Sequence, residues 1–195
     1  IGLADLWQYN RLFFNVEQFK GKYQFEYPFD RTPQDKIIQS DKSTYRVFEP
    51  RLGFSSSRAA YFHNSLGGYH GAKPALLQDV YDFHLYKQDS AVLDMLNVKF
   101  IIDDQYTDGV GKRQSALGPV WLVDEVVQLA NANEAIVQLN QIDPKTQAIS
   151  QTLKSTAYTS TATDTISLIE KRNNLLRYTV STTHQRLAVF SEMFY

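Results

Sequence analysis

The chain has 195 residues, enough for one large domain or two small ones with a core that needs no disulfide or metal. Its 20 Lys and Arg balance 21 Asp and Glu, and this near-zero charge excludes the bulk positive field that draws proteins to nucleic acid or anionic lipid. The absence of Cys excludes disulfides, thiolate metal sites and Cys nucleophiles, and the apolar runs are too short for a membrane span.

The first part of the chain predicts little regular structure before residue 32. Residues 5–30 are dense in aromatics but follow neither a helical nor a strand period, so we expect an irregular segment lying across the body. Thr32 followed by Pro33 is typical of a helix start, and this helix should end near Gln39. A strand is expected over residues 45–48.

The middle of the chain predicts a loop, two helices and a buried strand. Residues 51–72 are rich in Ser and Gly and indicate a loop. Pro74 can open a helix whose apolar residues recur at helical spacing. Asp89 has the position of an N-cap for a helix over residues 90–96, which leads into a buried strand over residues 98–102.

Strands are expected to dominate the last third of the chain. A surface loop over residues 103–117 precedes a strand over residues 120–129, and the spacing of Asn131 and Glu134 predicts a capping box on the next helix. Beyond it, two alternating segments flank a hairpin turn at residues 173–174. A last strand, buried on both faces, covers residues 187–190.

These elements predict an α+β fold in two parts. Residues 1–150 form a mixed α/β body, and residues 151–195 form an incomplete antiparallel β segment, read as the truncated start of a β-sandwich. The chain opens on Ile1 without an initiator Met and stops on Tyr195 at a strand-like run, so we expect an excised piece of a longer protein.

The spacing motifs of common enzymes are absent. The sequence has no G-x-S-x-G, H-E-x-x-H, S-x-x-K, P-loop or G-x-G-x-x-G. Residues 104–109 resemble a calcium loop, but Tyr106 stands where an oxygen ligand belongs, and position twelve of the loop is Ser115 instead of Glu. His63 and His70 lack a third ligand at diagnostic spacing. These spacings give no support to the common hydrolase, zinc-peptidase and nucleotide sites, and we expect no metal and no cofactor.

The segment from residue 57 to 73 has the composition of a sugar-binding loop. Aromatic faces stack on the C–H surfaces of sugars, and planar polar groups fix the hydroxyls. An architectural alternative stays open and is the more frequent one: Gly67 and Gly68 would supply a tight turn whose aromatics pack onto the body. Trp121 is expected in the core. The candidate glycan or docking residues are Arg58, Tyr61, His63, Asn64, Gly67, Gly68, Tyr69, His70 and Lys73.

Several collinear motifs resemble the YfhO-like polytopic membrane proteins of Bacteroidota. They include YFHNSLGGYH at 61–70, VLDMLNVKFII at 92–102, ALG at 116–118 followed by WLV at 121–123, and AVFSEMFY at 188–195. Pro74 and Leu77 depart locally from the family pattern.

The resemblance implies a context in the cell envelope. YfhO-like proteins are associated with membrane-embedded C-type glycosyltransferases that use polyprenyl-phosphate sugars, and their catalytic carboxylate would lie outside this chain. The resemblance therefore implies a non-catalytic extracytoplasmic domain at the periplasmic face of the inner membrane, which positions an acceptor glycan or braces the membrane part. The expected partners are its own transmembrane region and an envelope glycan or polyprenyl-linked sugar, and not nucleic acid.

Two other functions stay open at this point. The chain could be a scaffolding or protein-interaction domain whose Gly67–Gly68 loop docks on a partner without binding glycan. It could also be a soluble hydrolase, which would need two facing carboxyls roughly 5 to 9 Å apart.

Overall fold

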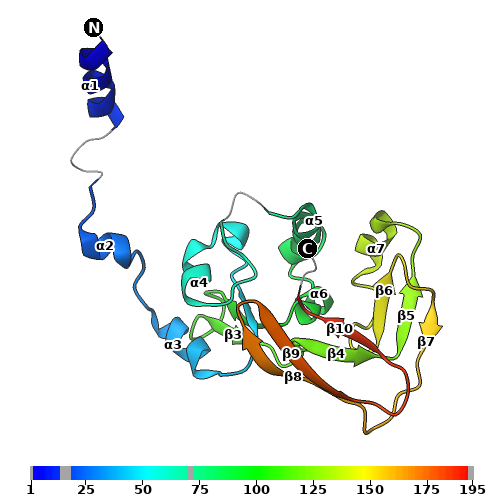
Figure 1. Cartoon of the computed structure of the whole chain (residues 1–195). Coiled ribbons are helices and arrows are strands. Elements are labelled where there is room, and N and C mark those ends of the chain that lie inside the picture. Colours follow the sequence, from blue (N-terminus) through cyan, green and yellow to red (C-terminus); the bar gives the residue numbers. More distant parts are fainter. Residues whose placement is uncertain (1, 14–18, 70–72, 193–195) are drawn as a thin grey trace. The chain divides into compact units, whose positions relative to one another are not determined.

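The computed structural model describes residues 2–13, 19–69 and 73–192 and divides the chain into two compact units, Ile1–Thr32 and Pro33–Tyr195. The fold is α+β, as predicted: seven α-helices accompany ten strands in four small sheets, and no barrel closes among the described residues (Figure 1). The predicted division at residue 150 and the predicted β-sandwich stay predictions.

The first unit is helical, which corrects the prediction of an irregular segment. It contains α1 (Gly2–Phe13) and α2 (Lys22–Glu26). In α1, Leu3, Leu6 and Phe13 lie on one face at intervals of three or seven residues, a spacing that a helix brings together. The helical period was missed because a single window over residues 5–30 crosses the ends of both helices.

The second unit begins as the sequence predicts and then departs from it. Helix α3 (Pro33–Ser40) starts at Pro33, and strand β1 (Arg46–Phe48) follows, so both predictions are confirmed. The predicted loop over residues 51–72 is wrong in part. It contains a 3-10 turn, η2 (Gly53–Ser55), and helix α4 (Ser57–Phe62). Arg58, Ala59 and Ala60 favour a helix, but six residues are too few for a helix to be stable by itself, so tertiary contacts such as the full burial of Ala59 stabilise α4.

Three helical segments lead to the central strand. They are α5 (Ala75–Phe83), the 3-10 turn η3 (Leu85–Lys87) and α6 (Ser90–Met95). The side chain of Asp89 accepts a hydrogen bond from the Ala91 backbone N–H (3.2 Å), which confirms the predicted cap of α6.

The first sheet has the order β1-β2-β3. Strand β2 (Val98–Ile102) has the predicted bounds, pairs in parallel with β1 and pairs antiparallel with β3 (Val110–Lys112). Strand β3 corrects the prediction of a loop over residues 103–117. Three residues are too few to show the alternation of apolar and polar side chains by which a strand is recognised in a sequence. Pairing with β2 stabilises this short strand.

The predicted strand over residues 120–129 is two strands. Strand β4 (Val120–Val123) and strand β5 (Glu125–Gln128) belong to different sheets. Strand β5 pairs in parallel with β6 (Gln147–Ser150) and antiparallel with β7 (Thr156–Ala157). An apolar run cannot reveal where a chain changes sheets, because both strands have the same composition.

The predicted cap between these strands is confirmed. Helix α7 (Ala132–Gln138) lies between β5 and β6 in the chain. Its Asn131 side chain accepts a hydrogen bond from the Glu134 backbone N–H (2.9 Å), as the capping-box spacing predicts.

The last strands confirm the hairpin and correct the predicted burial. Strands β8 (Thr165–Arg172) and β9 (Leu175–Ser181) form an antiparallel hairpin that turns at residues 173–174. Strand β10 (Leu187–Phe190) pairs antiparallel with β4 in a two-stranded sheet. It is half-buried rather than buried on both faces, and Phe190 is 46% exposed, because a sheet of two strands leaves both strands at an edge.

Strand β2 lies between the two hydrophobic clusters of the second unit. Val98 and Ile101 contribute to one cluster and Phe100 to the other, so both faces of β2 are covered. The larger cluster joins β1, β2, α6 and the segment after α4, and it comprises Phe48, Leu66, Leu85, Val92, Leu93, Val98 and Ile101. Strand β2 and helix α6 of this core also contribute residues to the cavities described below.

Arg186 connects the hairpin to the junction of β4 and β5. Its Nη1 donates to Asp164 Oδ2 (2.7 Å) and its Nη2 donates to Asp124 Oδ1 (2.6 Å), while its side chain is almost fully buried. The Thr161 hydroxyl donates to the other oxygen of Asp164 (2.7 Å). The hydrogen bond from Thr161, with further bonds from backbone N–H groups and Arg186, lowers the pKa of Asp164 from 3.8 to about 2.

We expect this site to make the fold sensitive to acid. Because the native pKa of Asp164 lies below that of the unfolded chain, its contribution is complete above pH 3.8 and is lost as the pH falls toward about 2. Urea unfolding midpoints measured across that window should decline, and Asp164→Asn should flatten the decline. The same substitution at the exposed Asp108 is the control, and an unchanged slope in Asp164→Asn would contradict this assignment.

Candidate functional site

Two of the predicted binding residues face a buried carboxylate. Asp35 of α3 is fully buried, and its Oδ1 lies 2.8 Å from His63 Nε2. Arg58 of α4 forms an ion pair with Oδ2 of the same carboxylate. The His63 side chain is 2% exposed. Arg58 and His63 therefore bind α4 and the segment after it to α3, which is an architectural role.

The glycine-rich part of the predicted loop packs closely on the body. The Val47 N–H donates to Asn64 O (2.9 Å), and the Leu66 N–H donates to Val47 O (2.8 Å). This segment therefore pairs with β1 along the edge of the strand. A Cβ on Gly67 would overlap the carbonyl oxygen of Gly53. Gly68 has a φ of +135°, a conformation that favours glycine. These contacts favour the architectural interpretation of Gly67 and Gly68.

The remaining predicted residues do not converge. Tyr69 is 83% exposed, and the Tyr61 ring packs edge-on against Phe62. Lys73 Nζ lies 3.7 Å from the centre of the Phe54 ring and donates to Gln78 Oε1 (2.9 Å). His70 lies outside the described residues.

Two cavities adjoin β4 in the second unit, and the described residues of the predicted loop line neither of them. The first, here called the Trp121 cavity, has a volume of about 820 Å³. Its walls come from the start of α6, residues 114–117, strand β4 and residues 142–145.

Trp121 is a wall of this cavity and not the core residue that the sequence predicts. Its side chain is half-buried, and its Nε1 donates to Pro144 O (2.8 Å). Among the described residues β4 pairs with β10 alone, and Trp121 borders the cavity together with Leu122. This hydrogen bond fixes the orientation of the indole ring.

The polar wall opposite β4 is built around one ion pair. Asp94 Oδ1 accepts a hydrogen bond from the Ser115 hydroxyl (2.7 Å) and pairs with Arg113. Arg113 Nη2 also donates to the carbonyl and hydroxyl oxygens of Ser90 (3.1 and 3.0 Å). These bonds hold residues 113–115 against α6.

Asp143 adds a second carboxylate to the Trp121 cavity. Its Oδ1 accepts a hydrogen bond from the Lys145 backbone N–H (3.0 Å), which shapes the turn beside Pro144. The cavity thus combines an aromatic ring with carboxylates, hydroxyls, a Lys and the amide of Gln114. These are groups that can bind a polyhydroxylated ligand.

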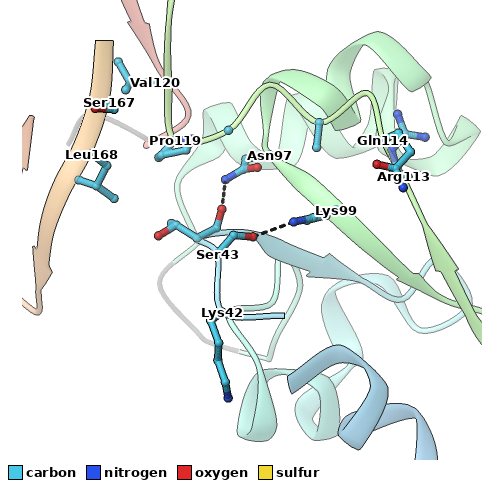
Figure 2. Close-up of a pocket in the computed structure, with 13 residues that line it drawn as sticks. Lys42, Ser43, Asn97, Lys99, Arg113, Gln114, Pro119, Val120, Ser167 and Leu168 are labelled. Atoms are coloured by element: carbon cyan, nitrogen blue, oxygen red, sulfur yellow. Dashed lines mark hydrogen bonds between the residues drawn. The ribbon is translucent and has the colours of Figure 1, made fainter. Parts of the chain in front are cut away.

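The second cavity lies between β8 and the segment that precedes β1 (Figure 2). It has a volume of about 630 Å³, and Lys99, Arg113 and Asn97 contribute to its walls. Asn97 Nδ2 donates to Thr44 O (2.9 Å), and Lys99 Nζ donates to Ser43 Oγ (2.8 Å).

Two of the three cations that line this second cavity, Lys99 and Arg113, have carboxylate partners. Lys99 Nζ lies 2.7 Å from Asp41 Oδ2, and Arg113 pairs with Asp94. The hydrogen bonds from Lys99 and Ser43 hold the pKa of Asp41 well below its usual value. These internal pairs neutralise much of the positive charge that the lining residues suggest, so the cavity is a weak candidate for an anion site.

The two cavities share Gln114 and Ala116 as lining residues. The segment of residues 114–117 therefore separates them, and Arg113 at its start fixes its position. Asp94, Arg113 and Trp121 have no diagnostic spacing in the sequence and are brought near one another only by the fold. No sequence pattern could therefore have identified this part of the molecule as a site.

Comparison with protein-family models, with curated proteins and with solved structures finds no match to this chain. Within residues 2–13, 19–69 and 73–192, no helix has the length and apolar content needed to cross a membrane. The same part of the chain contains no group of three or more His, Asp or Glu side chains placed to hold a metal ion.

Proposed function

We propose that the chain is a non-catalytic saccharide-binding domain and that the Trp121 cavity is its site. The observation that carries the proposal is a half-buried tryptophan at the wall of a cavity of about 820 Å³ that also presents Asp94, Gln114, Ser115 and Asp143. The indole ring can stack on the C–H face of a sugar, and the planar polar groups can bind its hydroxyls. The volume lies within the range of about 300 to 1,000 Å³ that is usual for ligand pockets.

The resemblance to YfhO-like proteins supplies the biological setting of the proposal. In that setting the domain lies at the periplasmic face of the inner membrane and positions an envelope glycan for a glycosyltransferase whose catalytic groups lie elsewhere in the protein. The site differs from the one expected from composition, because Arg58 and His63 are bonded to Asp35 and line neither of the two cavities.

A second candidate function is docking without glycan, and the exposure of Tyr69 favours it. A tyrosine with 83% of its surface in solvent, on a segment tightly bonded to β1, is suited to contact a protein such as the chain's own transmembrane region.

Trp121→Ala should weaken saccharide binding by roughly tenfold or more, because it removes the aromatic anchor of the site. An NMR titration of the 195-residue chain with envelope oligosaccharides measures the affinity and locates the shifts. Tyr69→Ala is the control and should bind as the unsubstituted chain does, since Tyr69 does not line the cavity.

The location of the shifts decides between the two candidate functions. Shifts at residues 114–117 and 142–145 support the Trp121 cavity. Shifts confined to the segment around Tyr69 would return the binding site to the loop, and no shifts with any oligosaccharide would overturn the saccharide proposal. In that case, loss of function on Tyr69→Ala in the full-length protein would support docking.

A further inference from the structure

Helix α1 has a clear apolar face. On an ideal helix Leu3, Leu6, Trp7, Tyr9 and Phe13 fall, with Asn10 among them, within an arc of about 160°, while Leu12 lies outside this arc with Asp5, Gln8 and Arg11. No residue of α1 is buried, and Leu3 is 87% exposed. The side chains that form this apolar face are Leu3, Leu6, Trp7, Tyr9 and Phe13.

The segment around α2 is also rich in exposed aromatic side chains. No residue of α2 is buried, and its rings lie beside one another, with the centres of Tyr23 and Tyr27 5.0 Å apart. The exposed aromatic residues of this segment are Phe19, Tyr23, Phe25 and Tyr27. An exposed apolar surface of this extent, in a unit of 32 residues, indicates a binding partner.

The side-chain chemistry of this unit fits a bilayer surface better than a protein groove. Trp and Tyr concentrate at the membrane–water interface, where the ring lies among lipid and its polar tip stays hydrated. Here these side chains are distributed over two short helices. A helix that binds in a protein groove would instead carry them in one stripe along a single helix. At 12 residues, α1 is about 18 Å long, too short to span a hydrocarbon core of about 30 Å.

The charge of the unit indicates how it would bind. Residues 1–32 contain four acidic and four basic side chains, so they have no net attraction for anionic lipid. Burial of apolar side chains would have to supply the affinity, as it does for amphipathic helices that lie in the interfacial plane.

We propose that α1 and α2 bind the surface of a phospholipid bilayer, with Leu3, Leu6, Trp7 and Phe13 entering the boundary between headgroups and acyl chains. This proposal does not depend on the saccharide site. It assigns the aromatic-rich first unit to membrane contact.

Vesicle flotation of the 195-residue chain tests the proposal without any substitution. The chain should float with neutral phosphatidylcholine vesicles, and added salt should change the bound fraction little. In the Trp121→Phe variant Trp7 is the sole tryptophan, since the chain has two, and its fluorescence should shift to the blue on addition of vesicles.

Two matched variants test which face of α1 binds. Leu6→Asp places a charge on the apolar face and should lower the vesicle partition coefficient at least tenfold, because a charged side chain resists entry into the bilayer. Gln8→Asp places the same charge on the polar face and should change it little. Thermal unfolding of both variants shows whether the second unit remains folded.

Three results would overturn the proposal. The first is an absence of flotation with neutral vesicles, and the second is flotation that requires anionic lipid and disappears in salt. The third is concentration-dependent self-association without vesicles that Leu6→Asp abolishes, which would identify a second copy of the chain as the partner of α1.

Discussion

Replacing Asp35 with Ala should lower the free energy of unfolding by about 3 kcal/mol, because it leaves buried polar groups without their partner. His63 is 2% exposed and would lose the acceptor of its Nε2 contact. Arg58 is partly exposed and can recruit water, which limits the loss. Urea denaturation followed by circular dichroism measures the change.

Asp104→Ala is the matched control for this substitution. Asp104 also pairs with an arginine, Arg51, but both side chains are largely exposed, so its removal should cost under about 1 kcal/mol. Equal losses in the two variants would show that burial around Asp35 contributes nothing. If the difference is found, loss of ligand binding on substitution of Arg58 or His63 should be attributed to unfolding and not to a missing ligand contact.

Phe48→Ala should cost about 4 kcal/mol, because it opens a cavity in the larger hydrophobic cluster. Phe48 is 1% exposed and lies among Leu66, Leu85, Leu93 and Val98. Thermal and urea unfolding of the variant should give the same loss if the second unit unfolds in one step.

Phe25→Ala removes the same side chain from the first unit and should change stability by less than about 0.5 kcal/mol, since Phe25 is 80% exposed. A large loss in Phe25→Ala would mean that the aromatic residues of α2 are part of a core, and it would also argue against their insertion into lipid. A small loss would show that the exposed aromatic residues of the first unit contribute little to the stability of the chain.

Local signals explain which elements could be predicted. The start of α3 at Pro33, the Asp89 and Asn131 caps and the turn at residues 173–174 depend on a few neighbouring residues whose chemistry is readable in sequence. Helix α4 and strand β3 are stabilised by distant partners, α3 and β2, so their own residues carry too weak a signal.

The candidate site was less predictable than the fold. Composition pointed to residues 57–73, but the fully buried Asp35, which lies more than twenty residues earlier in the chain, turns Arg58 and His63 inward. Trp121 was assigned to the core because it lies between Val120 and Leu122. In the structure β4 pairs with β10, and Trp121 lies beside a cavity and not in the core.

By itself, the sequence determined the α+β class, the absence of thiol chemistry and the places where most helices begin, since each follows from residue type or from contacts between near neighbours. Only the tertiary structure decided that Asp35 bonds both Arg58 and His63, and that Asp94, Ser115 and Trp121 line one cavity. Burial and contacts between distant residues are properties of the packed chain, and no local pattern encodes them.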